Sequence, residues 1–163
     1  MKIYMNLRNG VLGILIANLF VSTTFLTDIS MKEELVRIVI YSVLIEFAFY
    51  STHRMMHWNK LLFKYIHKEH HLEMEPSPID AYILTPAESA SVVFSFTFPN
   101  FIRFLITKRG MILVQTIHLI FGILVHGALK SVRHHMLHHK YLKGNYSGIY
   151  PFWDMVFGTY LSV

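Results

Sequence analysis

The sequence predicts an all-α fold, an integral membrane bundle of about four transmembrane or re-entrant helices with a cytosolic helical cap rich in histidine. The first observation is the composition: 53% of the 163 residues are hydrophobic and 15% are charged, whereas soluble domains carry about 25% charged residues. The second is that the apolar residues fall into four stretches. The third is that all eleven histidines lie between residues 53 and 139. The length fits a single domain, residues 1–163.

The four apolar stretches are the expected helices of the bundle. Residues 11–26 carry no charge and residues 111–129 carry two histidines, and these two stretches are the better candidates for spanning a bilayer. Residues 36–50 and 81–98 each contain an acid, and ionisable residues inside a membrane usually face the protein interior or a cavity. A soluble bundle of four buried helices is the alternative interpretation.

The distribution of basic residues predicts the orientation. With four crossings, residues 51–78 and 130–163 lie on the same side as the N-terminus, and that side holds ten of the fifteen Lys and Arg residues. The positive-inside rule makes this side cytoplasmic. The basic segment 100–110 fits this topology less well, and it would suit a shallow hairpin formed by the third and fourth stretches.

Composition also excludes several classes of site. The chain has no cysteine, so disulfides, thiolate zinc sites and cysteine nucleophiles are ruled out. The basic residues are spread out and form no patch of the kind that binds nucleic acid. Any bound metal must therefore be held by nitrogen and oxygen, and we expect no nucleic-acid partner.

Nine of the eleven histidines form three clusters, His53-x-x-x-His57, His67-x-x-His70-His71 and His134-His135-x-x-His138-His139. Residues three and four apart share a face of a helix, so each cluster is expected to present its imidazoles together. The clusters follow the second and fourth apolar stretches, and helices that leave the membrane on one side would bring them together just above the bilayer. Imidazole is the commonest neutral nitrogen ligand of transition metals.

The number of histidines favours two metal ions. Imidazole suits Fe, Zn, Cu and Ni, so ligand type alone does not choose the metal. A hydrolytic zinc site would need only three protein ligands and a water. Oxidation of an unactivated C–H bond by O₂ at two irons is a better match. Two other interpretations are a catalytically degenerate metal-binding membrane protein and a histidine-rich metal transporter, which should hold its ligands at the middle of the membrane.

The order of the histidine motifs resembles the membrane-bound fatty acid hydroxylase and sterol desaturase superfamily. The segments HKEHH (67–71) and AYILTPAE (81–88) look most like its sterol 4-methyl oxidase and sterol 25-hydroxylase branch. The most specific match is the segment HHMLHHKYLKGNYSGIYPFWDMVFGTY, residues 134–160. The resemblance covers about residues 45–160.

This resemblance implies a membrane-bound monooxygenase or desaturase with a di-iron centre, in which O₂ is the co-substrate and the lipid is a sterol or a fatty acyl chain. It implies an electron donor such as a b-type cytochrome, or a ferredoxin with its reductase. The membrane would be the endoplasmic reticulum of a eukaryote or the inner membrane of a bacterium, and overexpressed protein could hold zinc. The metal-site residues that it implies are His53, His57, His67, His70, His71, His126, His134, His135, His138 and His139.

Four further residues are candidates for the metal site or its surroundings. His118 is as well explained by packing in a helix as by metal ligation. Asn145, together with its neighbour Tyr146, could orient a ligand or simply form a turn. Asp154 and Glu88 could each hydrogen-bond a ligand imidazole; alternatively, Asp154 would cap a helix or form a salt bridge, and Glu88 would be a buried acid paired with a base.

Overall fold

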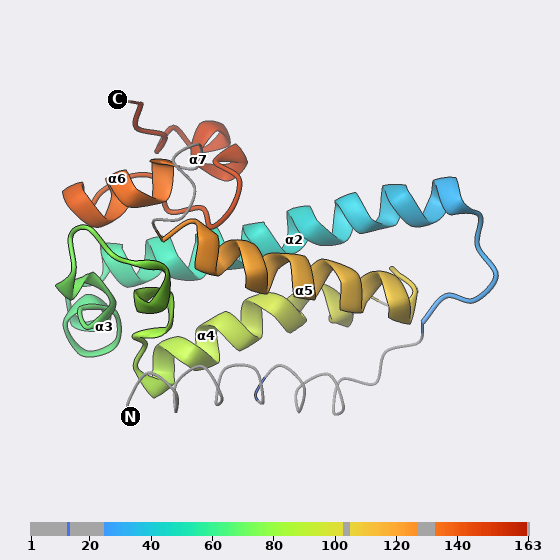
Figure 1. The fold of residues 1–163 in the computed structure, drawn as a ribbon, viewed down its shortest axis with the longest axis horizontal. Helices are drawn as coiled ribbons and strands as arrows, with labels where there is room; N and C mark the ends of the chain where they lie inside the picture. Colours follow the sequence, from blue (N-terminus) through green and yellow to red (C-terminus); the bar gives the residue numbers. More distant parts are fainter. Residues whose placement is uncertain (1–12, 14–24, 103–104, 127–132, 163) are drawn as a thin grey trace.

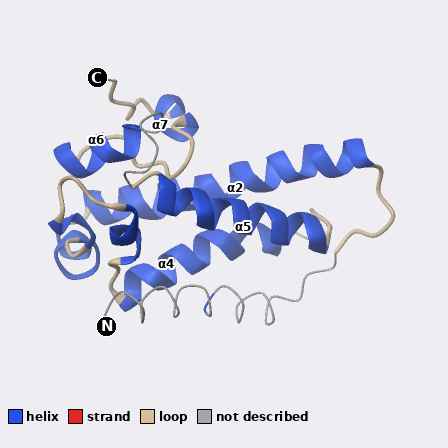
Figure 2. Cartoon of the chain, in the orientation of Figure 1, coloured by secondary structure: helices blue, strands red, loops and turns tan. Residues whose placement is uncertain are grey.

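A computed structural model gives the fold of the chain and describes residues 13, 25–102, 105–126 and 133–162 (Figure 1). The described residues form helices and loops and contain no strand, as expected for an all-α protein (Figure 2). The first predicted apolar stretch, residues 11–26, lies almost entirely outside the described residues.

The longest described helix, α2 (Met31–Trp58), carries the first histidine cluster at its C-terminal end. It begins at a capping box, in which the Ser30 hydroxyl accepts from the Glu33 amide and the Glu33 carboxylate accepts from the Ser30 amide. Among the described residues, α2 alone is long and apolar enough to cross a membrane. Helix α2 continues past residue 50, where the predicted apolar stretch ends. His53 and His57 therefore lie on its last turns.

Two more helices pack beside α2 (Figure 1). Helix α4 (Pro86–Thr97) starts at Thr85, whose side chain accepts from the Glu88 amide. Helix α5 (Lys108–Leu124) starts at Thr107 in the same way. These helices have 12 and 17 residues, fewer than the roughly 20 that span a bilayer. Their lengths favour the re-entrant alternative for the third and fourth predicted segments.

Helices α2 and α5 share a small apolar core with a polar network at its edge. Tyr41, Ile45 and Val114 are among the buried core residues. The Tyr41 hydroxyl donates to Asn100 Oδ1 at 2.6 Å and accepts from Gln115 Nε2 at 3.2 Å. These bonds satisfy the polar atoms buried between α2 and α5.

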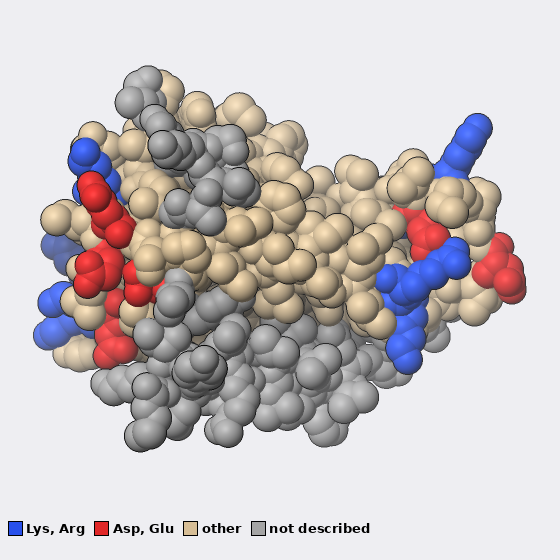
Figure 3. All heavy atoms as spheres, viewed as in Figure 1, with Lys and Arg blue, Asp and Glu red and all other residues tan. Residues whose placement is uncertain are grey.

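The outer surface of the bundle is apolar. On α2 the exposed side chains include Leu35, Val36 and Val39, and on α5 they include Ile112 and Ile120. Charged side chains gather at the two ends of the face shown in Figure 3. Exposed apolar surface on this scale marks contact with a membrane or a partner, and an apolar middle with charged ends is typical of a membrane-embedded protein.

Short helices cover the end of the bundle where α2 terminates (Figure 1). They bring segments from both halves of the chain to that end. They are α3 (Lys60–Leu62), the π-helix η1 (Phe63–His67), the 3₁₀-helices η2 (His70–Leu72) and η3 (Pro78–Tyr82), α6 (Arg133–Tyr141) and α7 (Phe152–Val156); a further 3₁₀-helix, η4 (Phe98–Phe101), follows α4 at its far end.

Candidate metal centre

Nine histidines converge in two neighbouring groups at the capped end of the bundle. In each group the nitrogen atoms offered as ligands all lie within 4.8 Å of one another. Helix α2, the η1–η2 segment, the end of α5 and α6 all contribute. The first group comprises His53, His57, His67, His71 and His138, and the second comprises His70, His126, His135 and His139.

The local backbone sorts neighbouring histidines into different groups. His67 ends a π-helical turn, and His71 leaves helical geometry with φ −94° and ψ 17°. His67 and His71 enter the first group, whereas His70 enters the second. The third cluster divides in the same way on the regular helix α6, where His135 and His139 share one group and His138 enters the other. The expectation that each cluster presents its imidazoles together therefore holds for residues four apart but not for their neighbours, which point about 100° away on a helix.

His71 Nε2 has more close nitrogen neighbours than hydrogen bonding can explain. Its Nε2 lies 2.8 Å from His67 Nε2, 3.0 Å from His57 Nε2 and 3.2 Å from His138 Nε2. One imidazole nitrogen offers either one proton or one lone pair, so three hydrogen bonds at that atom are impossible. A metal about 2.0–2.1 Å from each nitrogen would hold neighbouring ligand atoms roughly 3 Å apart. These nitrogens therefore fit a shared cation.

The second group shows the same spacing. His126 Nε2 lies 3.4 Å from His70 Nε2 and 3.1 Å from His135 Nε2. Both ring nitrogens of His139 are buried and have no hydrogen-bond partner. Unpaired buried nitrogens are costly, and a second cation would satisfy one of them. Both groups thus fit metal ions in number, type and spacing of donors.

Several histidines are oriented by an acceptor on their outer nitrogen. His53 Nδ1 donates to the Tyr146 carbonyl at 2.7 Å and His138 Nδ1 donates to the Gly144 carbonyl at 2.8 Å. A carbonyl oxygen can only accept, so the proton stays on Nδ1 and the lone pair of Nε2 faces the group. Fixing the tautomer in this way is typical of metal-binding histidines.

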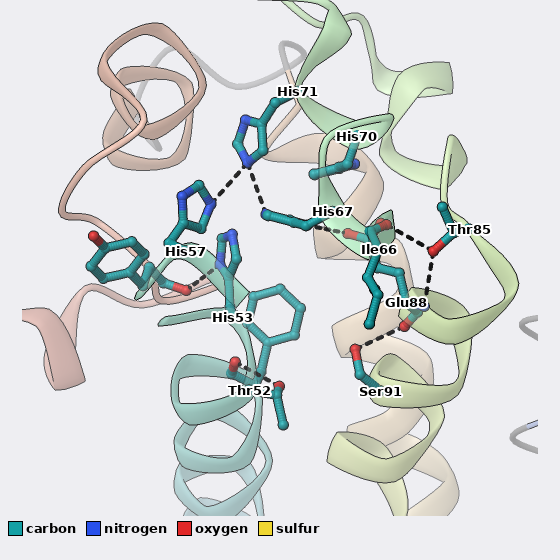
Figure 4. A network of polar contacts seen from close by, with 12 residues as sticks. Thr52, His53, His57, Ile66, His67, His70, His71, Thr85, Glu88 and Ser91 are labelled. Carbon is teal, nitrogen blue, oxygen red and sulfur yellow. Dashed lines mark hydrogen bonds and ion pairs between the residues drawn. The ribbon is translucent and has the colours of Figure 1, made fainter. Parts of the chain in front are cut away.

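Glu88 orients a third imidazole. Its Oε1 lies 2.6 Å from His67 Nδ1, and both side chains are buried (Figure 4). This is one of the two roles considered for Glu88 from the sequence. The acid lies on α4, so the contact also ties that helix to the histidine cluster.

Burial and the crowding of imidazoles lower the pKa of histidines in both groups and so keep them neutral. Desolvation and the neighbouring imidazoles lower the pKa of His70, His71, His135 and His138 well below the usual value. The same causes lower the pKa of His139 to about 3. Neutral imidazole is the form that binds metal, so these side chains are ready to act as ligands at neutral pH.

A loop after α6 supplies the backbone carbonyls. Gly144 and Asn145 have positive φ angles of 67° and 52°, and this turn directs the carbonyls of residues 144 and 146 toward the histidines. Asp154 fixes the loop, since its carboxylate accepts from the Tyr146 amide at 2.7 Å, the Ser147 amide at 2.8 Å and the Thr159 hydroxyl at 2.7 Å.

The structure places four of the candidate residues outside the two groups. His134 Nε2 donates to the Gly148 carbonyl at 3.1 Å, and His118 contacts Ser42 and Glu46 farther along the bundle. Asn145 bonds the backbone of Leu161 through both side-chain atoms, which matches the turn alternative. Asp154 bonds the loop rather than an imidazole.

Sequence reasoning missed the Gly144 carbonyl acceptor and one buried acid. Gly144 acts through its backbone, which no side-chain pattern reveals. Glu46 is buried on α2, and its carboxylate accepts from the Ile149 amide at 3.2 Å. An acid in the middle of an apolar stretch was the available signal for Glu46.

A cavity of about 100 Å³ adjoins both groups. Its walls are mostly apolar and come from α2, α4 and α5, with Phe49, Val92 and Phe96 among them. Histidines of both groups line one part of it. Apolar walls of this kind suit an apolar ligand such as part of a lipid.

Comparison with known proteins identifies a family whose model matches this chain and several proteins that are similar to it. The family model described as fatty acid hydroxylase matches residues 38–159. Methylsterol monooxygenase 1 of Rattus norvegicus is 32% identical over 68% of this chain and 41% of its own length. A Delta(7)-sterol 5(6)-desaturase of Aspergillus fumigatus is 31% identical over 71% of this chain and 34% of its own length. The chain thus spans less than half the length of these relatives. No solved structure matches it significantly.

Proposed function

Because the chain belongs to the fatty acid hydroxylase family, we propose that it is a membrane-bound di-iron oxidoreductase that uses O₂ to hydroxylate or desaturate a lipid. The observation that carries this proposal is the placement of two histidine groups along one apolar cavity. The sterol substrates in the names of the relatives make a sterol the first lipid to test, and a fatty acyl chain is the second.

The nine converging histidines are the proposed ligands, five for one iron and four for the other. When bound, the two irons would supply O₂ activation and the oxidising power that no amino-acid side chain has. His134 is proposed to support the loop at Gly148 rather than to bind metal. His118 is too far along the bundle to join either group.

The protein's own residues position the lipid and the ligands. The apolar side chains of α2, α4 and α5 bind the hydrocarbon and exclude water from the histidine groups. Glu88 and the carbonyls of residues 144 and 146 hold the imidazoles in place. This rigid arrangement is what a selective oxidation of one carbon requires.

We further propose that the cap faces the cytoplasm, at the endoplasmic reticulum of a eukaryote or the inner membrane of a bacterium. A soluble or membrane-bound carrier, such as a b-type cytochrome or a ferredoxin with its reductase, would deliver electrons there. The lysines of the cap, including Lys60 and Lys64, are exposed and would face this carrier.

The test is metal analysis and turnover of the same preparation. Protein purified from iron-supplemented cells should contain two irons per chain and, with a chemical or enzymatic reductant, convert a sterol or an acyl lipid in the presence of O₂. Two bound metals without turnover of any lipid would favour a degenerate metal-binding protein. Metal uptake into vesicles without lipid oxidation would favour a transporter. Reconstitution with iron is needed if zinc fills the site.

A further inference from the structure

A second polar site lies in the bundle, away from the two histidine groups. Glu46 and His118 are buried, with 4% and 5% of their surface exposed, and both line the apolar cavity described above. They also line a second cavity between α2, α5 and residues 150–153, together with Ser42. We call Ser42, Glu46 and His118 the polar trio.

The trio is separated from the metal centre by a defined length of helix. Glu46 precedes His53 on α2 by seven residues, which places both on one face of the helix and about 10 Å apart along its axis. The cavity connects the two positions. A lipid that contacts both would therefore have its oxidised carbon about 10 Å from the group held by the trio.

The hydrogen bond that His118 donates through Nδ1 leaves its Nε2 atom as a hydrogen-bond acceptor. Its Nδ1 donates to the Val114 carbonyl at 2.9 Å, so Nε2 carries a lone pair. Around Nε2 are the Ser42 hydroxyl at 3.3 Å and Glu46 Oε1 at 3.5 Å. Both distances are long for a hydrogen bond at a buried site. Both Glu46 oxygens accept from the single Ile149 amide at 3.2 Å.

The intervening polar residues of the cavity, Thr52 and Ser91, use their hydroxyl protons within the protein. The Thr52 hydroxyl donates to the carbonyls of Ala48 and Phe49 on its own helix. The Ser91 hydroxyl donates to the Glu88 carbonyl. Away from the histidine groups, His118 Nε2 is the imidazole acceptor that lines the cavity.

We propose that His118, supported by Ser42, binds the hydroxyl group of a lipid alcohol and so sets which carbon reaches the metals. A hydroxyl donates to an imidazole nitrogen and accepts from a serine hydroxyl at the same time, whereas an ester or thioester oxygen only accepts. The substrate class is therefore a lipid alcohol, either a sterol or a long-chain alcohol. This inference rests on the proposed function, because it takes the cavity to be the lipid site.

Binding of matched alcohols and ethers tests the proposal. The metal-loaded chain in detergent micelles is incubated with tritiated cholesterol, which is displaced by cholesterol, cholesterol methyl ether, 1-octadecanol or methyl octadecyl ether. Methylation removes the donor, and we expect it to weaken displacement about three- to tenfold for the lipid class that binds. His118→Leu should abolish this difference, whereas His118→Gln, which keeps an acceptor, should retain most of it. Metal content should stay at the wild-type value in both variants.

The outcomes separate this proposal from the proposed function. A preference for cholesterol identifies a sterol and a preference for octadecanol identifies a chain alcohol; both support the hydroxyl site. Equal displacement by alcohol and ether in the wild type, which needs no variant to fold, overturns it. A preference that persists in His118→Leu also overturns it. Hydroxyl-dependent binding without any oxidation would leave the site standing while the proposed function failed.

Discussion

Glu88 Oε1 lies 2.6 Å from His67 Nδ1, and Glu88 Oε2 is buried with no hydrogen-bond partner. The carboxylate thus holds the outer nitrogen of one imidazole and turns its inner nitrogen toward the first histidine group (Figure 4). Such a carboxylate–histidine pair fixes the tautomer and raises the basicity of the ligand. The pair explains why an acid is placed in an otherwise apolar helix.

Glu88→Ala should therefore weaken metal binding by about 10- to 100-fold, the range typical of losing such a partner. Glu88→Gln should be milder, because its amide oxygen can still accept from His67 Nδ1. Affinity can be measured by competition with a chelator. Glu75→Gln, an exposed acid, is the control and should bind metal like the wild type. Unchanged affinity in Glu88→Ala would contradict the assigned role.

The two groups predict separate effects of histidine substitutions on metal content. His70→Ala removes one of four ligands in the second group, and His138→Ala removes one of five in the first. We expect His70→Ala to retain about one ion per chain and His138→Ala to bind its ion more weakly. Both should lose turnover, while membrane insertion stays intact because these side chains lie outside the apolar stretches.

His134→Gln is the matched control for that experiment. His134 belongs to the same cluster in the sequence but bonds the Gly148 carbonyl. Its substitution should leave two ions per chain by elemental analysis. Loss of one ion in His134→Gln would mean that the ligand set has been assigned incorrectly.

The sequence predicts the chemistry of this site better than its arrangement. The histidine spacing and the acid at position 88 were enough to predict a metal centre and one residue that orients it. His70 and His71 enter different groups, as His138 and His139 do on the regular helix α6. This follows the angle of about 100° between neighbouring residues on a helix, but which groups they join depends on the packing of several segments, which the spacing alone does not give. The role of Asp154 depends on a loop with left-handed residues, which no helical or strand periodicity describes.

Two glycines with the same backbone angle should differ in their tolerance of alanine. Gly144 and Gly158 have φ angles of 67° and 66°, so alanine at either position costs about 1–2 kcal/mol in backbone strain. A Cβ at Gly144 would also lie 2.5 Å from the Thr159 carbonyl oxygen, whereas a Cβ at Gly158 would meet nothing within 4 Å.

Gly144→Ala should accordingly lower the unfolding temperature more than Gly158→Ala. It should also reduce metal affinity, because the Gly144 carbonyl accepts from His138 Nδ1. Thermal unfolding in detergent and a chelator titration measure the two effects. Equal behaviour of the two variants would show that the loop does not need its observed geometry to support the histidines.

Residues 72–78 and the segment after α7 should face the same aqueous compartment. His71 Nε2 lies 3.2 Å from His138 Nε2, so the chain must cross the membrane an even number of times between these residues. Two full spans and a re-entrant hairpin both satisfy this condition. The side that holds ten of the fifteen basic residues is then expected to be cytoplasmic. Tags within residues 72–78 and after residue 163 should both react with a reagent confined to the cytosol. Opposite accessibility of the two tags would contradict the shared metal centre, whereas joint protection from the reagent would reverse only the orientation.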